Sequence, residues 1–370
     1  MCDVPALRFP EFTGEWERHK LSEVCSFYSG GTPSSSKKEY YNGNIPFIRS
    51  GELHKDYTEL FITEAGLSNS AAKLVETGDL LLALYGATSG DIAISKIKGA
   101  INQAILCIRT KQNKKFIESV WNKHVERLLQ TYLQGGQGNL SADIVKNIPF
   151  YFANSNEQDK LAKFISLLDE RIATQNKIIE DLKKLKSAIS LKMLHSDSWE
   201  QFRIKDIAII GRGRVISSVE ISQQKNPTYP VYSSQTSNEG IMGYLDDYMF
   251  EGEYISWTTD GANAGTVFYR DGKFNCTNVC GLLKLKKDFD THFVSLVLAE
   301  ATKKYVSVNL ANPKLMNNTM GNIQIHLPKL EEQKRISIVF RRLHELLATH
   351  NSLLAEYSKQ KQYLLSQMFI

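Results

Sequence analysis

The sequence has few cysteines and lacks long hydrophobic runs. Its five cysteines, Cys2, Cys25, Cys107, Cys276 and Cys280, cannot all pair, and their spacing is not that of a disulfide framework. The longest apolar stretches, such as residues 80–84, are far too short to cross a bilayer. The first residues also lack the basic-then-apolar layout of a signal peptide. We therefore expect a cytoplasmic protein with no membrane partner.

Signatures of catalysis are also missing. The chain has no P-loop, no His-Glu-x-x-His and no Gly-x-Ser-x-Gly motif. Residues 226–229, Asn-Pro-Thr-Tyr, differ in one position from the Asn-Pro-Pro-Tyr tetrapeptide of amino-methyltransferases, but no glycine-rich loop for a methyl donor is present, so we interpret them as a turn. Cys276 and Cys280 lack a second Cys/His pair at zinc spacing. The sequence predicts no metal site, no cofactor bound by this chain and no enzymatic activity.

Length and charge leave several classes open. At 370 residues the chain can form two or three domains, and its 42% hydrophobic content is that of an ordinary globular protein. A net charge of +5 is compatible with a nucleic-acid partner but does not by itself indicate one.

The chain repeats itself. A Trp-Glu pair at Trp16 recurs at Trp199, and a Glu-Gln pair at Glu157 recurs at Glu332. The separations are 183 and 175 residues, so the second copy is slightly shorter. A period near half the chain is too long for a solenoid and indicates two copies of a whole domain-plus-helix unit.

Each copy ends in a long heptad pattern. Apolar residues alternate at spacings of four and three from Leu161 to Met193 and again from Ile336 to Met368, which is typical of a coiled-coil seam. Both seams are interrupted at equivalent positions, Gln175 with His350 and Lys186 with Lys361. Polar seam residues are best known as devices that set register and partner choice. We predict that the two helices pair antiparallel; the simpler alternative is that each packs only on its own domain.

The fold class predicted is α+β, with two α/β heads related by internal duplication and separated by two long helices that form an antiparallel coiled coil. The expected boundaries are 1–156 and 196–331 for the heads, and 157–195 and 332–370 for the helices. Strands are expected at 45–49, 80–84 and 104–108, and helices at 115–133 and 291–306. Residues 86–90 match 261–265 as a glycine-bounded loop in both heads.

Several loops combine small, amide, basic and aromatic residues, a composition suited to nucleic acid. Asn and Gln can bind adenine in a bidentate way, Arg binds guanine, and Ser and Thr often contact phosphates. Any one such loop could be an ordinary surface turn, but they recur at matched places. The predicted DNA-binding residues of the first head are Ser29, Gly30, Gly31, Thr32, Ser34, Ser35, Lys37, Tyr40, Arg49, Thr88, Ser89, Gln134, Gln137 and Asn139. Those of the second head are Arg212, Arg214, Ser233, Ser234, Gln235, Asn238, Asn263, Asn278, Asn309, Asn312 and Lys314.

These motifs, in duplicated order, resemble the specificity subunits of type I restriction–modification systems over essentially the whole chain. The resemblance rests on the two Trp openings, residues 140–149, the two Glu-Gln helix starts, the two long helices and the lead-in at residues 7–12. One departure is that family members carry a proline-rich lead into each long helix, which the second copy keeps at residues 326–331 and the first lacks at 151–156.

The resemblance implies that each head is a target-recognition domain for half of a split, asymmetric site in double-stranded DNA, with the helices setting the gap. It implies two modification subunits as partners, which would carry S-adenosylmethionine and methylate adenine, and further restriction–translocase subunits. From the residues alone, two alternatives stay open: a coiled-coil adaptor with two protein-interaction domains, and a self-contained DNA methyltransferase.

Overall fold

The computed structural model describes residues 4–132, 140–307 and 312–370. The chain forms two compact units. Unit 1 comprises the chain up to Lys177 together with Asn351–Ile370, and unit 2 is Ile178–His350. Each unit therefore combines one head with parts of both long helices. Among the described residues, no helix is both long and apolar enough to span a membrane.

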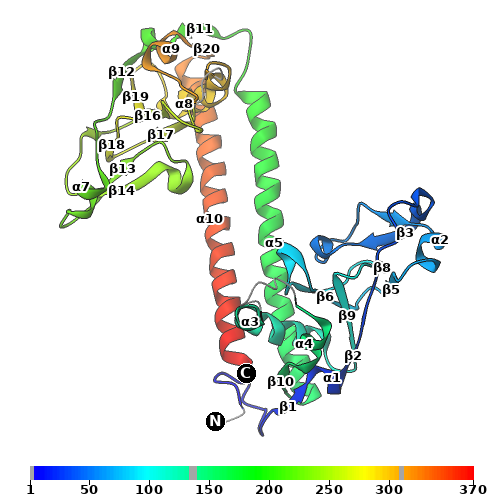
Figure 1. Ribbon diagram of the computed structural model, residues 1–370. Helices are drawn as coiled ribbons and strands as arrows, with labels where there is room; N and C mark the ends of the chain where they lie inside the picture. The colour runs from blue at the N-terminus through cyan, green and yellow to red at the C-terminus, as the bar shows by residue number, and fades with distance from the viewer. Residues whose placement is uncertain (1–3, 133–139, 308–311) are drawn as a thin grey trace. The chain divides into compact units, whose positions relative to one another are not determined.

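Unit 1 contains three small sheets (Figure 1). Strands β1 (Glu17–Lys20) and β10 (Pro149–Phe152) form an antiparallel pair. An antiparallel sheet has the order β2 (Cys25–Ser29), β9 (Ile105–Thr110), β6 (Leu80–Ala83), β7 (Ile92–Ile94). A mixed sheet has the order β4 (Phe61–Ile62), β3 (Tyr41–Ile48), β8 (Gly99–Ile101), β5 (Lys73–Val75), in which β3 and β8 are parallel.

The helices of unit 1 cover these sheets. They are α1 (Leu21–Val24), α2 (Glu64–Ser68), α3 (Lys114–Tyr132), α4 (Ala142–Asn147) and the first part of α5 (Ser155–Met193). Helix α3 buries Phe116 and Trp121 against the antiparallel sheet. The indole of Trp121 donates a hydrogen bond to the carbonyl of Gly90 at 2.7 Å, which attaches the helix to the loop after β6. One core therefore lies between α3 and the β2–β9–β6–β7 sheet, and a second, which includes Leu81, Cys107 and Ile101, lies between that sheet and the mixed sheet.

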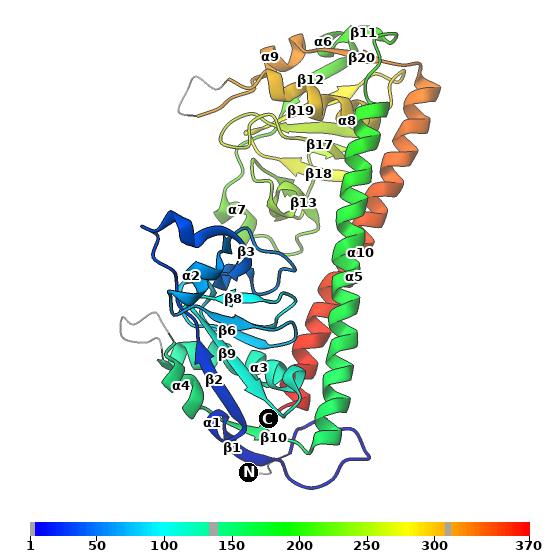
Figure 2. The same ribbon diagram turned by 90° about the vertical axis from the view of Figure 1, so that its right-hand side faces the viewer.

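Unit 2 repeats this arrangement in the same order (Figure 2). Strands β11 (Glu200–Arg203) and β20 (Gln324–Leu327) form an antiparallel pair. The antiparallel sheet has the order β12 (Ala208–Arg212), β19 (Cys280–Leu285), β16 (Tyr254–Thr258), β17 (Val267–Arg270). The mixed sheet has the order β14 (Ile241–Leu245), β13 (Tyr229–Tyr232), β18 (Lys273–Cys276), β15 (Phe250–Glu251). Its helices are α6 (Ile204–Ile207), α7 (Ser218–Ser222), α8 (Thr291–Ala301), α9 (Asn317–Asn322) and the first part of α10 (Leu330–Met368). The internal duplication and the α+β class are confirmed.

Most local predictions hold. The expected strands overlap β3, β6 and β9, each extending one residue beyond the observed strand, and α3 has nearly the expected bounds. The helix expected at 291–306 is shorter, because α8 ends at Ala301 and continues as a 3-10 turn, Thr302–Lys304. Thr302 is fully buried and its hydroxyl donates to the carbonyl of Gly265 at 2.9 Å. This tertiary bond draws the chain out of the helical path.

The two long helices pair antiparallel in each unit. In unit 1, Asp169 of α5 forms an ion pair with Lys361 of α10 at 2.6 Å, and the guanidinium of Arg171 lies 5.9 Å from the ring centre of Tyr357. Residue numbers along α10 therefore decrease as those along α5 increase, which is antiparallel pairing. In unit 2, the other ends of the same two helices share a core that includes Ile189 and Phe340. All twenty predicted seam positions are buried or half-buried. The heptad pattern is thus the buried face that joins these helices, as predicted.

Both long helices are anchored by the glutamine of the repeated Glu-Gln pair. In unit 1 the buried side chain of Gln158 donates to the carbonyl of Ala153 at 2.7 Å and accepts from the backbone N–H of Asn113 at 3.1 Å. Gln333 donates in the same way to the carbonyl of Pro328 at 2.8 Å. The missing proline of the first copy therefore leaves this anchor intact, and Asn154 caps α5 by accepting from the N–H of Glu157 at 3.0 Å.

Candidate nucleic-acid interface

In unit 2, five segments that are far apart in sequence meet at one edge of the two four-stranded sheets. Backbone hydrogen bonds join Arg214 to Cys276 at 3.1 Å, Thr277 to Tyr232 at 2.9 Å, and Gly261 to Pro313 at 3.0 Å. We call this surface the loop edge of unit 2, and it comprises residues 212–214, 233–238, 260–263, 277–279 and 312–314. It brings together most of the residues predicted to bind DNA in the second head.

Unit 1 has an equivalent edge. The N–H of Gly31 donates to the carbonyl of Ile101 at 3.3 Å, the hydroxyl of Thr32 donates to Gln103 Oε1 at 2.6 Å, and β3 runs beside β8 so that Arg49 follows the strand next to Asn102. The loop edge of unit 1 comprises residues 29–32, 49–51, 85–89 and 102–103. The glycine loops match closely: Gly90 donates to Ala83 and Gly265 to Thr258, both at 2.8 Å.

The single basic residue of the unit 1 edge, Arg49, is engaged in ion pairs. Arg49 lies 2.7 Å from Glu52 and 3.1 Å from Glu59. Burial alone would raise the pKa of Glu52, but hydrogen bonds from the side chain and backbone of Arg49 and from Thr58 outweigh it and lower that pKa to about 2. The ion pairs hold the guanidinium of Arg49 in position, and the two carboxylates offset its positive charge. This edge therefore presents oriented hydrogen-bonding groups more than free positive charge.

The unit 2 edge is more open to an anion. Arg214 forms a bidentate pair with Glu220, and Lys314 lies 3.6 Å from Asp260. Arg212 is exposed at the end of β12, where its guanidinium contacts only the sulfur of Met316 at 3.9 Å; no acidic partner lies near it within the part of the chain that the structure describes. Arg212 is therefore the basic side chain of this edge most available to a phosphate or a guanine.

The structure places three of the residues predicted to bind DNA within the packing of unit 1. Tyr40 is only 7% exposed and accepts a hydrogen bond from Lys37 Nζ at 2.9 Å, so it supports the turn instead of presenting a ring. Gly30 and Gly31 do not free the backbone for DNA: a Cβ atom on either would collide with Ile101 or Ala71. Their small size serves internal packing, where the loop after β2 lies against neighbouring segments.

The other predicted residues divide into three groups. Exposed positions are Ser34, Ser35, Lys37, Asn238, Asn263, Asn278 and Asn312. Half-buried positions whose side chains bond to backbone or pack in the loops are Ser29, Thr88, Ser89, Ser233, Ser234 and Gln235; for example, Ser89 donates to Leu84 at 3.0 Å and Gln235 to Ile241. Gln134, Gln137, Asn139 and Asn309 lie outside the described residues.

Two residues of the unit 1 edge were missed by sequence reasoning. Gln103 is exposed, and its side-chain carbonyl oxygen accepts a hydrogen bond from the hydroxyl of Thr32 at 2.6 Å. Tyr85 is 37% exposed beside the glycine loop. The signal that could have found Gln103 is positional, because residues 102–103 stand where the predicted Asn278 turn stands in the second copy.

The polar seam residues have distinct surroundings. Lys361 forms an ion pair with Asp169, which also lies 2.6 Å from Lys115 of α3. Burial alone would raise the pKa of Asp169, but hydrogen bonds from the two lysines lower it. Lys186, Gln175 and His350 are half-buried on their helices. The carboxylate of Asp169 on α5 thus links Lys361 of α10 and Lys115 of α3.

Cys276 and Cys280 are buried side by side at the end of β18 and the start of β19, with 0% and 3% exposure. This placement agrees with their interpretation as small core residues. Residues 226–228 precede β13, and Tyr229 is its first residue; the N–H of Asn226 donates to Asp246 Oδ1 at 2.9 Å. Residues 226–228 form a loop that leads into the sheet.

Comparison with known proteins agrees with this duplicated architecture. A family model for the type I restriction modification DNA specificity domain matches the chain twice, over residues 13–184 and 196–357. A putative type I specificity subunit of Mycoplasma pneumoniae is 38% identical over 194 residues, which are 51% of this chain and 80% of that protein. The specificity subunit of the type I restriction enzyme MpnII of the same organism is 45% identical over 141 residues, 38% of this chain and 42% of that protein.

Solved structures show the same fold. The S subunit of a type I restriction–modification system from M. genitalium matches with a TM-score of 0.73 and 16% identity over 99% of both chains. A chain from a type I restriction–modification complex matches with a TM-score of 0.55 and 14% identity, over 96% of this chain and 97% of that chain. The two matches of the family model cover most of the sequence, and the chain therefore belongs to the type I restriction–modification DNA specificity family.

Proposed function

We propose that the chain is the non-catalytic subunit that gives a type I restriction–modification complex its DNA sequence specificity. Each loop edge reads one half of a bipartite, asymmetric site in double-stranded DNA. The observation that carries this proposal is the contrast between the repeated frame and the unlike side chains of the two edges. Equivalent positions hold Ser29, Gly31 and Gln103 in unit 1 but Arg212, Arg214 and Asn278 in unit 2.

The chemistry of the edges supports unequal half-sites. Amide side chains such as Gln103 and Asn278 can form the paired hydrogen bonds that distinguish adenine, whereas Arg212 suits guanine or a phosphate. Because many basic groups are already paired with carboxylates, the chain alone should bind DNA weakly and with strong salt dependence.

The paired helices set the gap between half-sites in this proposal. The predicted seam from Leu161 to Met193 is about 50 Å long at 1.5 Å per residue, comparable to about 15 base pairs of B-DNA. Two modification subunits dock on the helices and heads and methylate adenine, and S-adenosylmethionine binds to those subunits and not to this chain. Restriction–translocase subunits complete the complex in the cytoplasm.

The test is a genome-wide map of methylated adenine in cells that express the chain with its modification subunits. We expect a split motif with a fixed gap. Gln103→Ala should relax or change only the first half-site, and Arg212→Ala together with Asn278→Ala only the second. Gln362→Ala, an exposed substitution on α10, should leave the motif unchanged. An undivided motif, or substitutions in one unit that alter both half-sites, would refute the proposal.

A further inference from the structure

In unit 1, the segment before Trp16, residues 4–15, packs against the start of α5 as an arm that contains a turn, in which the N–H of Phe12 donates to the carbonyl of Phe9 at 3.1 Å. Arg8 forms a bidentate pair with Glu157, with both N–O distances at 2.7 Å, and the indole of Trp16 donates to the same carboxylate at 3.3 Å. Glu157 is 1% exposed and Trp16 is 3% exposed. The arm therefore covers a carboxylate that would otherwise face solvent.

Further contacts fix the direction of the arm. Phe9 packs edge-on against Phe164 with ring centroids 5.9 Å apart, and Lys160 Nζ lies 4.5 Å from the centre of the Phe9 ring while it also pairs with Glu11. The backbone N–H of Leu7 donates to the carbonyl of Gln367 at 2.9 Å. The arm thus contacts the first turns of α5 through one cation, one anion and one aromatic ring, and the last turns of α10 through a backbone hydrogen bond.

Unit 2 repeats the residues that the arm contacts in unit 1, but it has no arm. In the internal repeat, Glu332 is equivalent to Glu157, Arg335 to Lys160, Trp199 to Trp16 and Lys192 to Gln367. The residues before Trp199 are the end of α5 and a short connection, with no Arg-Phe-Pro-Glu-Phe sequence. These four residues line one cavity of about 1220 Å³.

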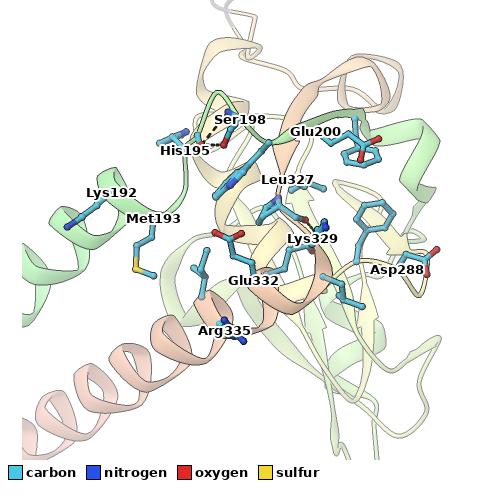
Figure 3. Close-up of a pocket in the computed structure, with 18 residues that line it drawn as sticks. Lys192, Met193, His195, Ser198, Glu200, Asp288, Leu327, Lys329, Glu332 and Arg335 are labelled. Carbon is cyan, nitrogen blue, oxygen red and sulfur yellow. Dashed lines mark hydrogen bonds between the residues drawn. The ribbon is translucent and has the colours of Figure 1, made fainter.

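The polar groups of the cavity are accessible. Figure 3 shows Glu332 among the lining residues, between Met193 and Lys329. Glu332 is exposed and Trp199 is half-buried, in contrast to their buried counterparts in unit 1. One turn beyond Arg335, Val339 is 36% exposed at the position where Phe164 receives Phe9. The same chemistry of recognition is therefore present and uncovered.

We propose that this cavity is a peptide-binding groove for a segment of a partner protein with the chemistry and the turn of residues 7–12. An arginine of the segment pairs with Glu332, a carboxylate two to three residues later pairs with Arg335, and an aromatic ring between them packs on Val339. A backbone N–H bonds to the carbonyl at the end of α5, as Leu7 does on α10. This binding involves no DNA, so it goes beyond the proposed recognition of sequence.

The arm of a second copy of this chain is a poor occupant. Each arm is tethered beside its own groove in unit 1, where its effective concentration is on the order of millimolar or more. Exchange between copies would vacate one groove to fill another and would leave the number of contacts unchanged. A segment from a different protein adds contacts instead, and is the occupant that the groove favours.

The test uses a fluorescently labelled peptide of residues 4–13, Val-Pro-Ala-Leu-Arg-Phe-Pro-Glu-Phe-Thr, titrated with the full chain by fluorescence anisotropy. We expect saturable binding that Glu332→Ala weakens at least about tenfold, because a charge-assisted bidentate pair is lost. The neighbouring exposed Glu331→Ala is the matched control and should bind as the unchanged chain does. A charge exchange, Arg335→Glu with a peptide in which Arg replaces the residue matching Glu11, should restore binding that either change alone weakens.

Three results would overturn the proposal. The first is no saturable binding up to about millimolar chain, the range of weak peptide affinities. The second is binding that Glu332→Ala leaves unchanged, which would place the peptide in unit 1. The third is self-association of the chain that disappears on deletion of residues 1–13, which would identify a second copy as the occupant.

Discussion

The side-chain oxygen of Gln333 accepts a hydrogen bond from the backbone N–H of Asp290 at 3.0 Å, although 43 residues separate the two. Asp290 caps α8 by accepting from the N–H of Phe293 at 2.7 Å, so Gln333 connects the first turn of α10 to the start of the helix that covers the sheet. Gln158 and Asn113 form the same link in unit 1. One buried amide in each copy therefore orients a long helix on its head.

We predict that Gln333→Ala destabilises the chain by about 2–4 kcal/mol, because it leaves the N–H of Asp290 and the carbonyl of Pro328 buried without partners. The midpoint of urea unfolding measures this loss. Gln158→Ala should have a similar effect in unit 1, and the exposed Gln362→Ala should change stability by less than about 0.5 kcal/mol. Equal effects of all three substitutions would show that the buried amides do not anchor the helices.

Gly30→Ala should destabilise unit 1 by about 1–3 kcal/mol, because the new methyl group collides with the backbone of Ile101. The matched control is Gly51→Ala, where a Cβ meets nothing within 4 Å. Thermal unfolding distinguishes the two. If Gly30→Ala left stability unchanged and weakened only DNA binding, the glycine would serve the DNA surface and not internal packing.

The stability of unit 2 should fall as the pH drops from about 6.5 toward 4. His292 packs edge-on against Tyr269 with centroids 5.2 Å apart, and its Nδ1 lies 2.8 Å from the hydroxyl of Ser337. Burial lowers the pKa of His292 from 6.5 to about 4, and the positive charges of Arg341, His344 and Lys186 act in the same direction. The negative charge of Asp290 opposes this shift but does not cancel it. Between these values the unfolded chain binds a proton that the folded chain does not, so acid favours unfolding.

His292→Gln should flatten this part of the pH dependence, and the exposed His326→Gln should not. Unfolding temperatures recorded at intervals between pH 4 and pH 7 give the comparison. An unchanged slope in His292→Gln would assign the acid sensitivity to other groups.

Removal of one heptad from each long helix, residues 179–185 and residues 344–350, should shorten the gap in the methylated motif. Seven residues correspond to about 10 Å of helix, or about three base pairs. Both half-sites should stay the same, since the loop edges are untouched. A variant in which the same heptads are replaced by others with the same apolar seam is the control and should keep the gap. A constant gap in the deletion variant would rule out the helices as the spacer.

Sequence reasoning succeeded where the signal is local or repeated. Heptad spacing identified α5 and α10, and the matched landmarks identified the duplication, because these patterns depend only on residue order. It did not anticipate the packing of Tyr40 and Gly30 or the place of Gln103 at the loop edge. Whether a tyrosine faces solvent, what a glycine lies against and which amide completes an edge all depend on segments distant in sequence. Thr32 and Gln103, for example, are 71 residues apart.

The sequence by itself determined that there are two copies of one frame, that each ends in a long helix, and that the two seams break at equivalent polar positions. Only the tertiary structure decided which loops meet at each edge and how identical residues at equivalent positions differ in their surroundings. Glu157 and Glu332 occupy matched positions, yet one is buried beneath Arg8 and the other is exposed in a cavity. The physical reason is that burial and pairing belong to the surroundings of a side chain, and those surroundings are assembled only when distant segments fold together.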